Sequence, residues 1–180
     1  MGHYKSWSGL KKQLEQFLCE EFRGRITYFL ARYHQVHNSY GRAAIRLDGN
    51  ELVCFSWIEM YQQDADLGLQ WRESGAYDEK TLKEKWDREK TYHDLDFLDA
   101  ALQFSGMSIA QALGSENYII KIFAVLDGRV GKRKLAEIAR RREYAAYPDW
   151  VRQFYELRLN ALCSHSDRKM TSITEKEQSI

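Results

Sequence analysis

Seven cationic residues gather in one short stretch, and their types and spacing point to phosphate binding. They are Arg129, Lys132, Arg133, Lys134, Arg140, Arg141 and Arg142, and Glu137 is the only acid among them. On a straight helix turning ~100° per residue, Arg129, Arg133 and Arg140 fall within about 40° of one another. Such a stripe can neutralise successive phosphates, and arginine does so with bidentate geometry.

Two other interpretations of this stretch stay open. Blocks of like charge are more often a solvated surface, and the acids of the preceding predicted helix (Asp94, Asp96, Asp99) are possible counterions. Nearby aromatic residues suit base stacking or a protein interface, and they also suit ordinary helix packing. The candidate residues for binding nucleic acid or another partner are Arg129, Lys132, Arg133, Lys134, Arg140, Arg141, Tyr147 and Trp150.

Other chemistries lack the residues that they need. The pair Gly131-Lys132 has neither the P-loop spacing nor the following hydroxyl residue. Asp48 and Glu59 could start a nuclease hairpin, but Tyr61 stands where that site needs lysine. No Cys-x-x-Cys or His-Glu-x-x-His occurs, so the sequence predicts no metal, no cofactor and no catalytic residue. A cysteine–histidine pair that meets only in the fold stays open.

The cysteines and the apolar runs bear on the compartment. Cys19, Cys54 and Cys163 are odd in number and far apart, which favours buried free thiols in a reducing compartment. The longest apolar run, Tyr118 to Leu126, is interrupted by Lys121 and falls short of the ~20 residues of a membrane span. No apolar leader is evident at the N-terminus, so we expect a cytoplasmic protein with no membrane partner.

Composition bounds the size and the class of the protein. The 180 residues hold 27 Lys plus Arg against 26 Asp plus Glu, a formal net charge of +1. The 13% aromatic content is too high for a fully disordered chain. The balanced charge disfavours an acidic nucleic-acid mimic and a strongly cationic binding arm.

Hydrophobic periodicity predicts a helix and three strands in the first half. Apolar residues at spacings of three and four predict an amphipathic helix that Ser6 or Ser8 caps and Gly24 ends. Alternating patterns then predict strands over residues 25–34, 42–47 and 51–61. The pair Asp48-Gly49 predicts a type I′ hairpin turn.

The second half has helical periodicity. Predicted helices begin near Thr81, Thr91, Ser108 and Ser115, one more spans Val130 to Tyr144, and Pro148 opens the last. The predicted fold class is therefore α+β, with an N-terminal helix, a three-stranded antiparallel β-meander and a helical C-terminal half. We expect a single domain over residues 1–163, a possible seam at 62–77 and a flexible polar tail at 164–180.

The order of elements resembles a double-stranded-RNA-binding domain in topology only. In that family the second helix opens with lysines that contact phosphates, whereas residues 62–66 here are neutral or acidic. A second resemblance covers most of the chain, up to about Cys163. It rests on the opening residues 6–14, the 41–49 hairpin and the run 127–133. Together these segments resemble an uncharacterised family of small bacterial cytoplasmic proteins, for which the resemblance implies no activity.

Three functions are consistent with the sequence. The first is a non-catalytic protein that contacts nucleic acid or a nucleoprotein through the basic helix. The second is a protein-binding inhibitor or adaptor in phage–host conflict, for example an inhibitor of a CRISPR nuclease such as Cas9. The third is an enzyme whose site the sequence does not reveal.

Overall fold

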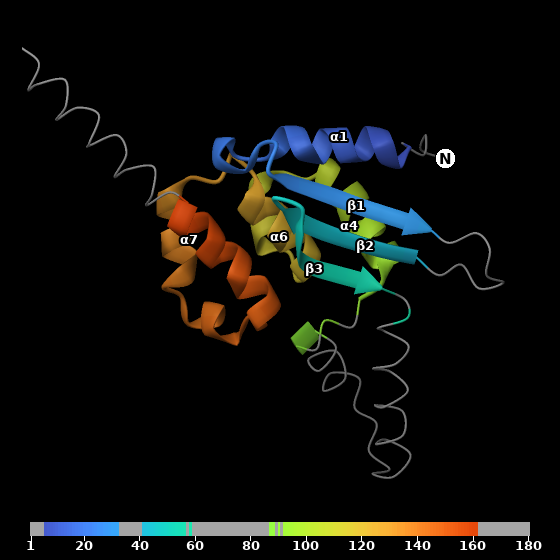
Figure 1. Cartoon of the computed structure of the whole chain (residues 1–180). Helices are drawn as coiled ribbons and strands as arrows, with labels where there is room; N and C mark the ends of the chain where they lie inside the picture. Colours follow the sequence, from blue (N-terminus) through green and yellow to red (C-terminus); the bar gives the residue numbers. More distant parts are fainter. Residues whose placement is uncertain are drawn as a thin grey trace, which may run out of the picture.

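The computed structural model describes residues 6–32, 41–56, 58, 87–88, 90 and 92–161. It confirms the predicted α+β class, with an N-terminal helix, a three-stranded antiparallel sheet and a helical second half (Figure 1). The predicted seam at 62–77, the Thr81 helix start and the tail at 164–180 lie outside the described residues.

The first helix, α1 (Trp7–Phe17), begins where the sequence predicts and ends earlier. The Ser6 hydroxyl caps it by accepting a hydrogen bond from the amide of Gly9 (3.4 Å). Gly24 has the predicted left-handed conformation (φ 78°), but it follows a separate 3₁₀ turn, η1 (Glu20–Phe22).

The early end of α1 has a tertiary cause. Leu18 and Cys19 have extended backbones (ψ 139° and 159°) that a helix could not continue. The Cys19 amide donates to the carbonyl oxygen of Leu126 (3.0 Å), and Leu18 forms an isolated β-bridge with Asp127. Pairing with this distant segment replaces the helical hydrogen bonds, and the sequence around Leu18 gives no sign of it.

The sheet is the predicted meander in the order β1-β2-β3. Its strands are β1 (Ile26–Arg32), β2 (Gly41–Leu47) and β3 (Asn50–Ser56). Asp48 and Gly49 both have positive φ (51° and 84°), as a type I′ turn requires, so this turn prediction is confirmed.

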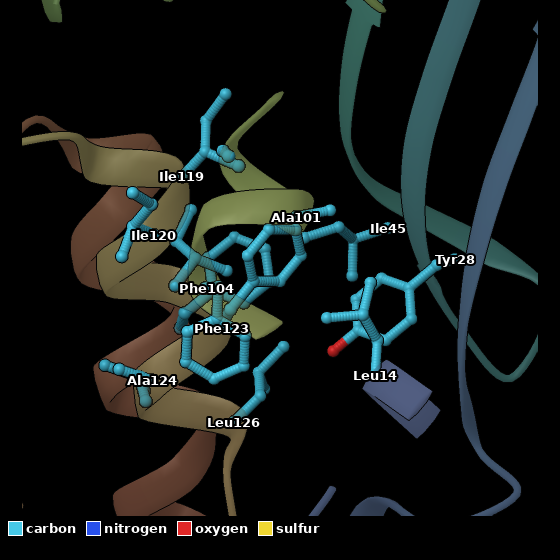
Figure 2. Close-up of a cluster of buried hydrophobic side chains, with 14 of the residues drawn as sticks. Leu14, Tyr28, Ile45, Ala101, Phe104, Ile119, Ile120, Phe123, Ala124 and Leu126 are labelled. Atoms are coloured by element: carbon cyan, nitrogen blue, oxygen red, sulfur yellow. The ribbon is translucent and has the colours of Figure 1, made fainter. Parts of the chain in front are cut away.

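An aromatic cluster joins the sheet to the helices behind it. Helix α4 (Asp94–Ser105) covers the inner face of the sheet, and α1 lies along β1 (Figure 1). The buried ring of Phe97 contacts Tyr28, Phe55 and Phe123 at centroid distances of 5.4–6.5 Å. Figure 2 shows Phe123 in the same cluster as Phe104 and Ile45.

The remaining helices follow in short steps. They are α5 (Ile109–Gly114), α6 (Tyr118–Leu126), α7 (Lys132–Ala139), the 3₁₀ helix η2 (Arg142–Ala146) and a last helix over residues 149–161. The predicted Ser108–Gln111 capping box is present. The cap of α6 is Asn117 rather than the predicted Ser115. No helix among the described residues has the length and apolar character of a membrane span.

The predicted helix over residues 130–144 is wrong in extent. Helix α7 ends at Ala139, and a separate 3₁₀ helix follows. Leu135 and Ile138 are buried on the apolar side of α7. The next positions on the same side of the helix are Arg141 and Arg142. Helix formation depends on burial of an apolar face, so the helix stops where that face stops.

Candidate nucleic-acid interface

Arg129 is part of a structural turn and is not on α7. Its guanidinium donates to both oxygens of the buried Asp127 carboxylate (3.0 and 2.6 Å) and lies 4.6 Å from the ring centroid of Phe17. The neighbouring Gly128 amide donates to the Phe17 carbonyl oxygen (2.8 Å). The hydrogen bonds and charge of Asp127 raise the pKa of Arg129. The predicted common face of Arg129, Arg133 and Arg140 is therefore wrong for its first member.

Arg133 on α7 and Arg140, the C-cap residue that follows this helix, lie along its outermost side. At ~100° per residue they lie about 20° apart and roughly opposite the side that buries Leu135 and Ile138. Both arginines are exposed, as is Arg142 at the start of η2. Within the part of the chain that the structure describes, no carboxylate forms a salt bridge with any of these three arginines.

Glu137 holds two other cations on the surface of α7. Its carboxylate accepts hydrogen bonds from Arg141 and from Lys134 (3.1 Å), and these bonds lower the pKa of Glu137. All three side chains are about half exposed, so each pair contributes little to stability. Arg129, Lys134 and Arg141 therefore pair with Asp127 and Glu137, and not with the acids of α4 that the sequence suggested.

Charge is concentrated in this part of the molecule. Residues 132–143 contain six cations and two glutamates, a net charge of +4 in a chain whose total is +1. We call the exposed surface of α7 and η2 that carries this charge the cationic surface.

The first turn of α7 carries charge of the unfavourable sign. The positive end of the helix dipole lies there, and acidic residues or a capping side chain usually compensate it. Here the N-cap is Gly131, which provides no side-chain hydrogen bond, and the turn contains no acid. Lys132, Arg133 and Lys134 occupy it instead. An anionic partner would reduce the electrostatic repulsion between these side chains and the helix dipole.

A groove of about 620 Å³ lies beside the cationic surface. Its lining residues come from α5, α6, α7 and η2 and are Ala110, Leu113, Gly114, Lys121, Lys134, Ile138, Arg141, Glu143, Tyr144 and Tyr147. Its volume falls within the range of small-ligand sites. The lining combines flat aromatic and aliphatic walls with three cations and one acid.

Lys121 is a buried cation in this groove. It is 8% exposed, and its ammonium donates to the carbonyl oxygens of Ser115 and Leu113 (3.4 Å), where it caps the C-terminus of α5. It also lies 5.5 Å from the ring centroid of Tyr147. Burial lowers the pKa of Lys121, and the charge of the nearby Glu116 partly opposes this effect. No carboxylate in the described structure forms a salt bridge with Lys121, which is unusual for a buried charge.

The two candidate aromatic residues have different environments. The Trp150 ring contacts Phe55, Tyr92 and Tyr118, and its indole N–H donates to the Asp87 carbonyl oxygen (2.7 Å). Trp150 is thus largely a packing residue.

Tyr147 packs against other rings and also faces the groove. Its ring contacts Tyr118, Tyr144 and Tyr155. It also lines a second groove of about 680 Å³, where Asp87 and Asp149 balance Arg88 and Arg152. Burial raises the pKa of Tyr144 and Tyr147, so both hydroxyls stay protonated hydrogen-bond donors at neutral pH.

The described residues offer little for catalysis. Cys19 and Cys54 are buried free thiols, as predicted, whereas Cys163 lies outside the described residues. Burial raises the pKa of Cys19 to about 11, which makes it a poor nucleophile. His93, the described histidine, accepts the Leu95 amide through Nδ1 (3.0 Å) as the cap of α4. No group of three or more metal-ligating side chains occurs in the described ranges.

The structure thus brings together most of the predicted binding residues and separates two of them. Lys132, Arg133, Lys134, Arg140, Arg141 and Tyr147 lie on or beside the cationic surface, whereas Arg129 and Trp150 have structural contacts. Sequence reasoning missed Lys121 as a groove residue. Its signal was a single charged side chain within an apolar helix.

Comparison with known proteins gives a family and no function. No curated protein and no solved structure matches the chain. One family model matches residues 6–159, which is most of the chain, and its description names no activity. The match includes α1, the sheet and the cationic surface. The chain therefore belongs to the SF0329 protein family.

Proposed function

We propose that this protein is a non-catalytic binder of single-stranded nucleic acid and that the cationic surface contacts the phosphates. The observation that carries the proposal is the exposure of Arg133, Arg140 and Arg142 without a salt bridge to any described carboxylate. Exposed arginines of this kind are available to phosphate oxygens, with which they form bidentate hydrogen bonds.

The spacing on α7 suits a phosphate backbone. Arg133 and Arg140 are seven residues apart on one ridge, about 10 Å along the helix axis at ~1.5 Å per residue. That length is about three steps of a nucleic-acid strand at ~3.4 Å each. Two arginines so placed can contact phosphates of one strand without bending it, and Arg142 extends the set beyond the helix.

The neighbouring groove favours a single strand over a duplex. Tyr144 and Tyr147 lie in the groove beside Lys134 and Arg141, so aromatic rings lie next to phosphate-binding cations. Unpaired bases stack on aromatic side chains while their phosphates follow a positive surface. Bases inside a duplex cannot reach such rings, because they are stacked on one another.

The test is a binding measurement with a charge-matched control. The triple variant Arg133→Gln, Arg140→Gln, Arg142→Gln removes three phosphate contacts. At about 0.1 M salt these contacts contribute a factor of about 100 to single-strand affinity, from ~0.7 logarithmic units per contact. Fluorescence anisotropy with a labelled oligonucleotide measures this loss, and circular dichroism checks that the variant is folded.

The control variant carries Lys11→Gln, Lys12→Gln and Arg25→Gln. These residues lie on α1 and in the turn before β1, so the net charge changes equally on other elements. We expect the control to bind within about threefold of the parent protein, because long-range charge alone has a small effect at this salt concentration. Equal losses in both triple variants would contradict a specific role for the cationic surface. A preference for duplex would overturn the single-strand assignment.

A further inference from the structure

We infer that the groove beside α7 holds the terminal phosphate and end nucleotide of the bound strand. This inference rests on the proposed function and assigns the part of the strand that enters the groove. The part of the strand that binds in the groove is a nucleoside monophosphate unit, with a flat base and a phosphate monoester.

Lys121 is the first reason to place a terminal phosphate here. Lys121 is 8% exposed and lines the groove, and its ammonium contacts two backbone carbonyl oxygens and the Tyr147 ring, while the nearby Glu116 acts on it electrostatically. A terminal phosphate carries about −1.5 to −2 charges at neutral pH, whereas a diester within the strand carries one. A desolvated cation discriminates between them because a low dielectric strengthens charge interactions.

The rim of the groove supplies further hydrogen-bond donors. Lys134 and Arg141 line it, and their shared partner Glu137 is an exposed surface acid that a phosphate can replace. The protonated hydroxyls of Tyr144 and Tyr147 add two neutral donors. Glu143 is the one acid in the lining, and it disfavours a ligand that carries negative charge along its whole length.

The walls fit the remainder of the nucleotide. Leu113 and Ile138 give the groove aliphatic sides, and the two tyrosines give it aromatic ones. A nucleobase stacks on such surfaces whatever its sequence. An inorganic anion alone would leave these walls uncovered, so the apolar surface and the buried cation together indicate an organic phosphate.

The test compares oligonucleotides of one sequence that end in a 5′-phosphate, a 3′-phosphate or hydroxyl groups only. We expect one phosphorylated form to bind the wild-type protein about tenfold tighter, the effect of one charge-assisted hydrogen bond. The variant Ala110→Glu places a carboxylate on an exposed wall position of α5 and should abolish this preference. Lys121→Met, which keeps the apolar stem, should abolish it too.

A matched control lies next to the test position. Gln111→Glu introduces the same charge on the same helix, is absent from the groove lining and retains the capping box with Ser108. It should preserve the tenfold preference. Thermal melting of each variant checks folding, and Ala110→Glu keeps the test valid if Lys121→Met unfolds.

The outcomes separate this inference from the proposed function. Equal binding of phosphorylated and hydroxyl-ended strands by the wild-type protein overturns the groove assignment and leaves the proposed function intact. Absence of binding to every strand overturns the proposed function. A free nucleoside monophosphate should compete weakly, because it lacks the contacts to Arg133 and Arg140. Competition as strong as that of the phosphorylated strand would overturn the strand-end assignment in favour of a free nucleotide.

Discussion

Substitution of Gly131 by aspartate should make the protein more stable and a weaker binder. Gly131 is the N-cap of α7, has an ordinary φ of −78°, and a Cβ added there meets no atom within 4 Å. An aspartate side chain can therefore accept hydrogen bonds from the uncapped amides of the first turn. Its charge also compensates Lys132, Arg133 and Lys134 at the positive end of the helix dipole.

The magnitude follows from these two contributions. A capping side chain adds a few tenths of a kcal/mol over glycine, and a favourable charge at a helix end adds about 0.3–1 kcal/mol. The free energy of unfolding should rise by about 1 kcal/mol, which raises Tm by about 2–4 °C for a protein of this size. Single-strand affinity should fall about fivefold at about 0.1 M salt, the equivalent of one phosphate contact.

Urea denaturation and fluorescence anisotropy measure the two effects on the same samples. Gly131→Asn is the matched control, because asparagine caps the helix without adding charge. It should gain part of the stability and keep the parent affinity. If Gly131→Asp and Gly131→Asn bind equally well, the first turn of α7 does not face the ligand, and its charges do not contribute to binding.

Three further predictions concern the fold. Phe97→Ala removes a ring that contacts several aromatic neighbours and should cost about 3–5 kcal/mol in urea denaturation, whereas a loss below about 1 kcal/mol would contradict its central place. Hydrogen bonds from two arginines lower the pKa of Glu51 from 4.5 to about 2, so the stability that Glu51 adds is complete above pH 4.5 and lost as pH falls toward 2. Glu51→Gln should thus destabilise by up to about 1 kcal/mol at neutral pH and by less in acid, and a pH-independent difference would argue against the ion pair. In a Cys163→Ser variant, Cys19 and Cys54 should react with a thiol reagent at pH 8 only after denaturation, and rapid labelling of the native protein would contradict their burial.

Local sequence signals predicted much of the fold because local physics determines those features. The turn at Asp48 and Gly49 needs positive φ at adjacent residues, and few sequences supply it. Ser6 and Ser108 cap helices through hydrogen bonds that span three residues. Each of these signals is complete within a short segment, so no knowledge of the tertiary structure was needed.

The missed features depend on contacts between distant segments. Helix α1 stops early because Cys19 pairs with Leu126, more than a hundred positions away. Lys121 reaches the groove because the C-terminus of α5 presents backbone carbonyl oxygens to it, and backbone groups leave no mark in a sequence. By contrast, the spacing of Lys134 and Arg141 around Glu137 is three and four residues. Those ion pairs could have been predicted from the helical pattern.

The salt dependence of single-strand binding tests the central claim most directly, because it counts phosphate contacts. With Arg133, Arg140 and Arg142 each contacting one phosphate, the logarithm of the association constant should fall against the logarithm of salt concentration with a slope of about −2 or steeper. The triple glutamine variant of these arginines should lose about two units of that slope. A wild-type slope shallower than about −1, or no measurable binding at low salt, would contradict the account.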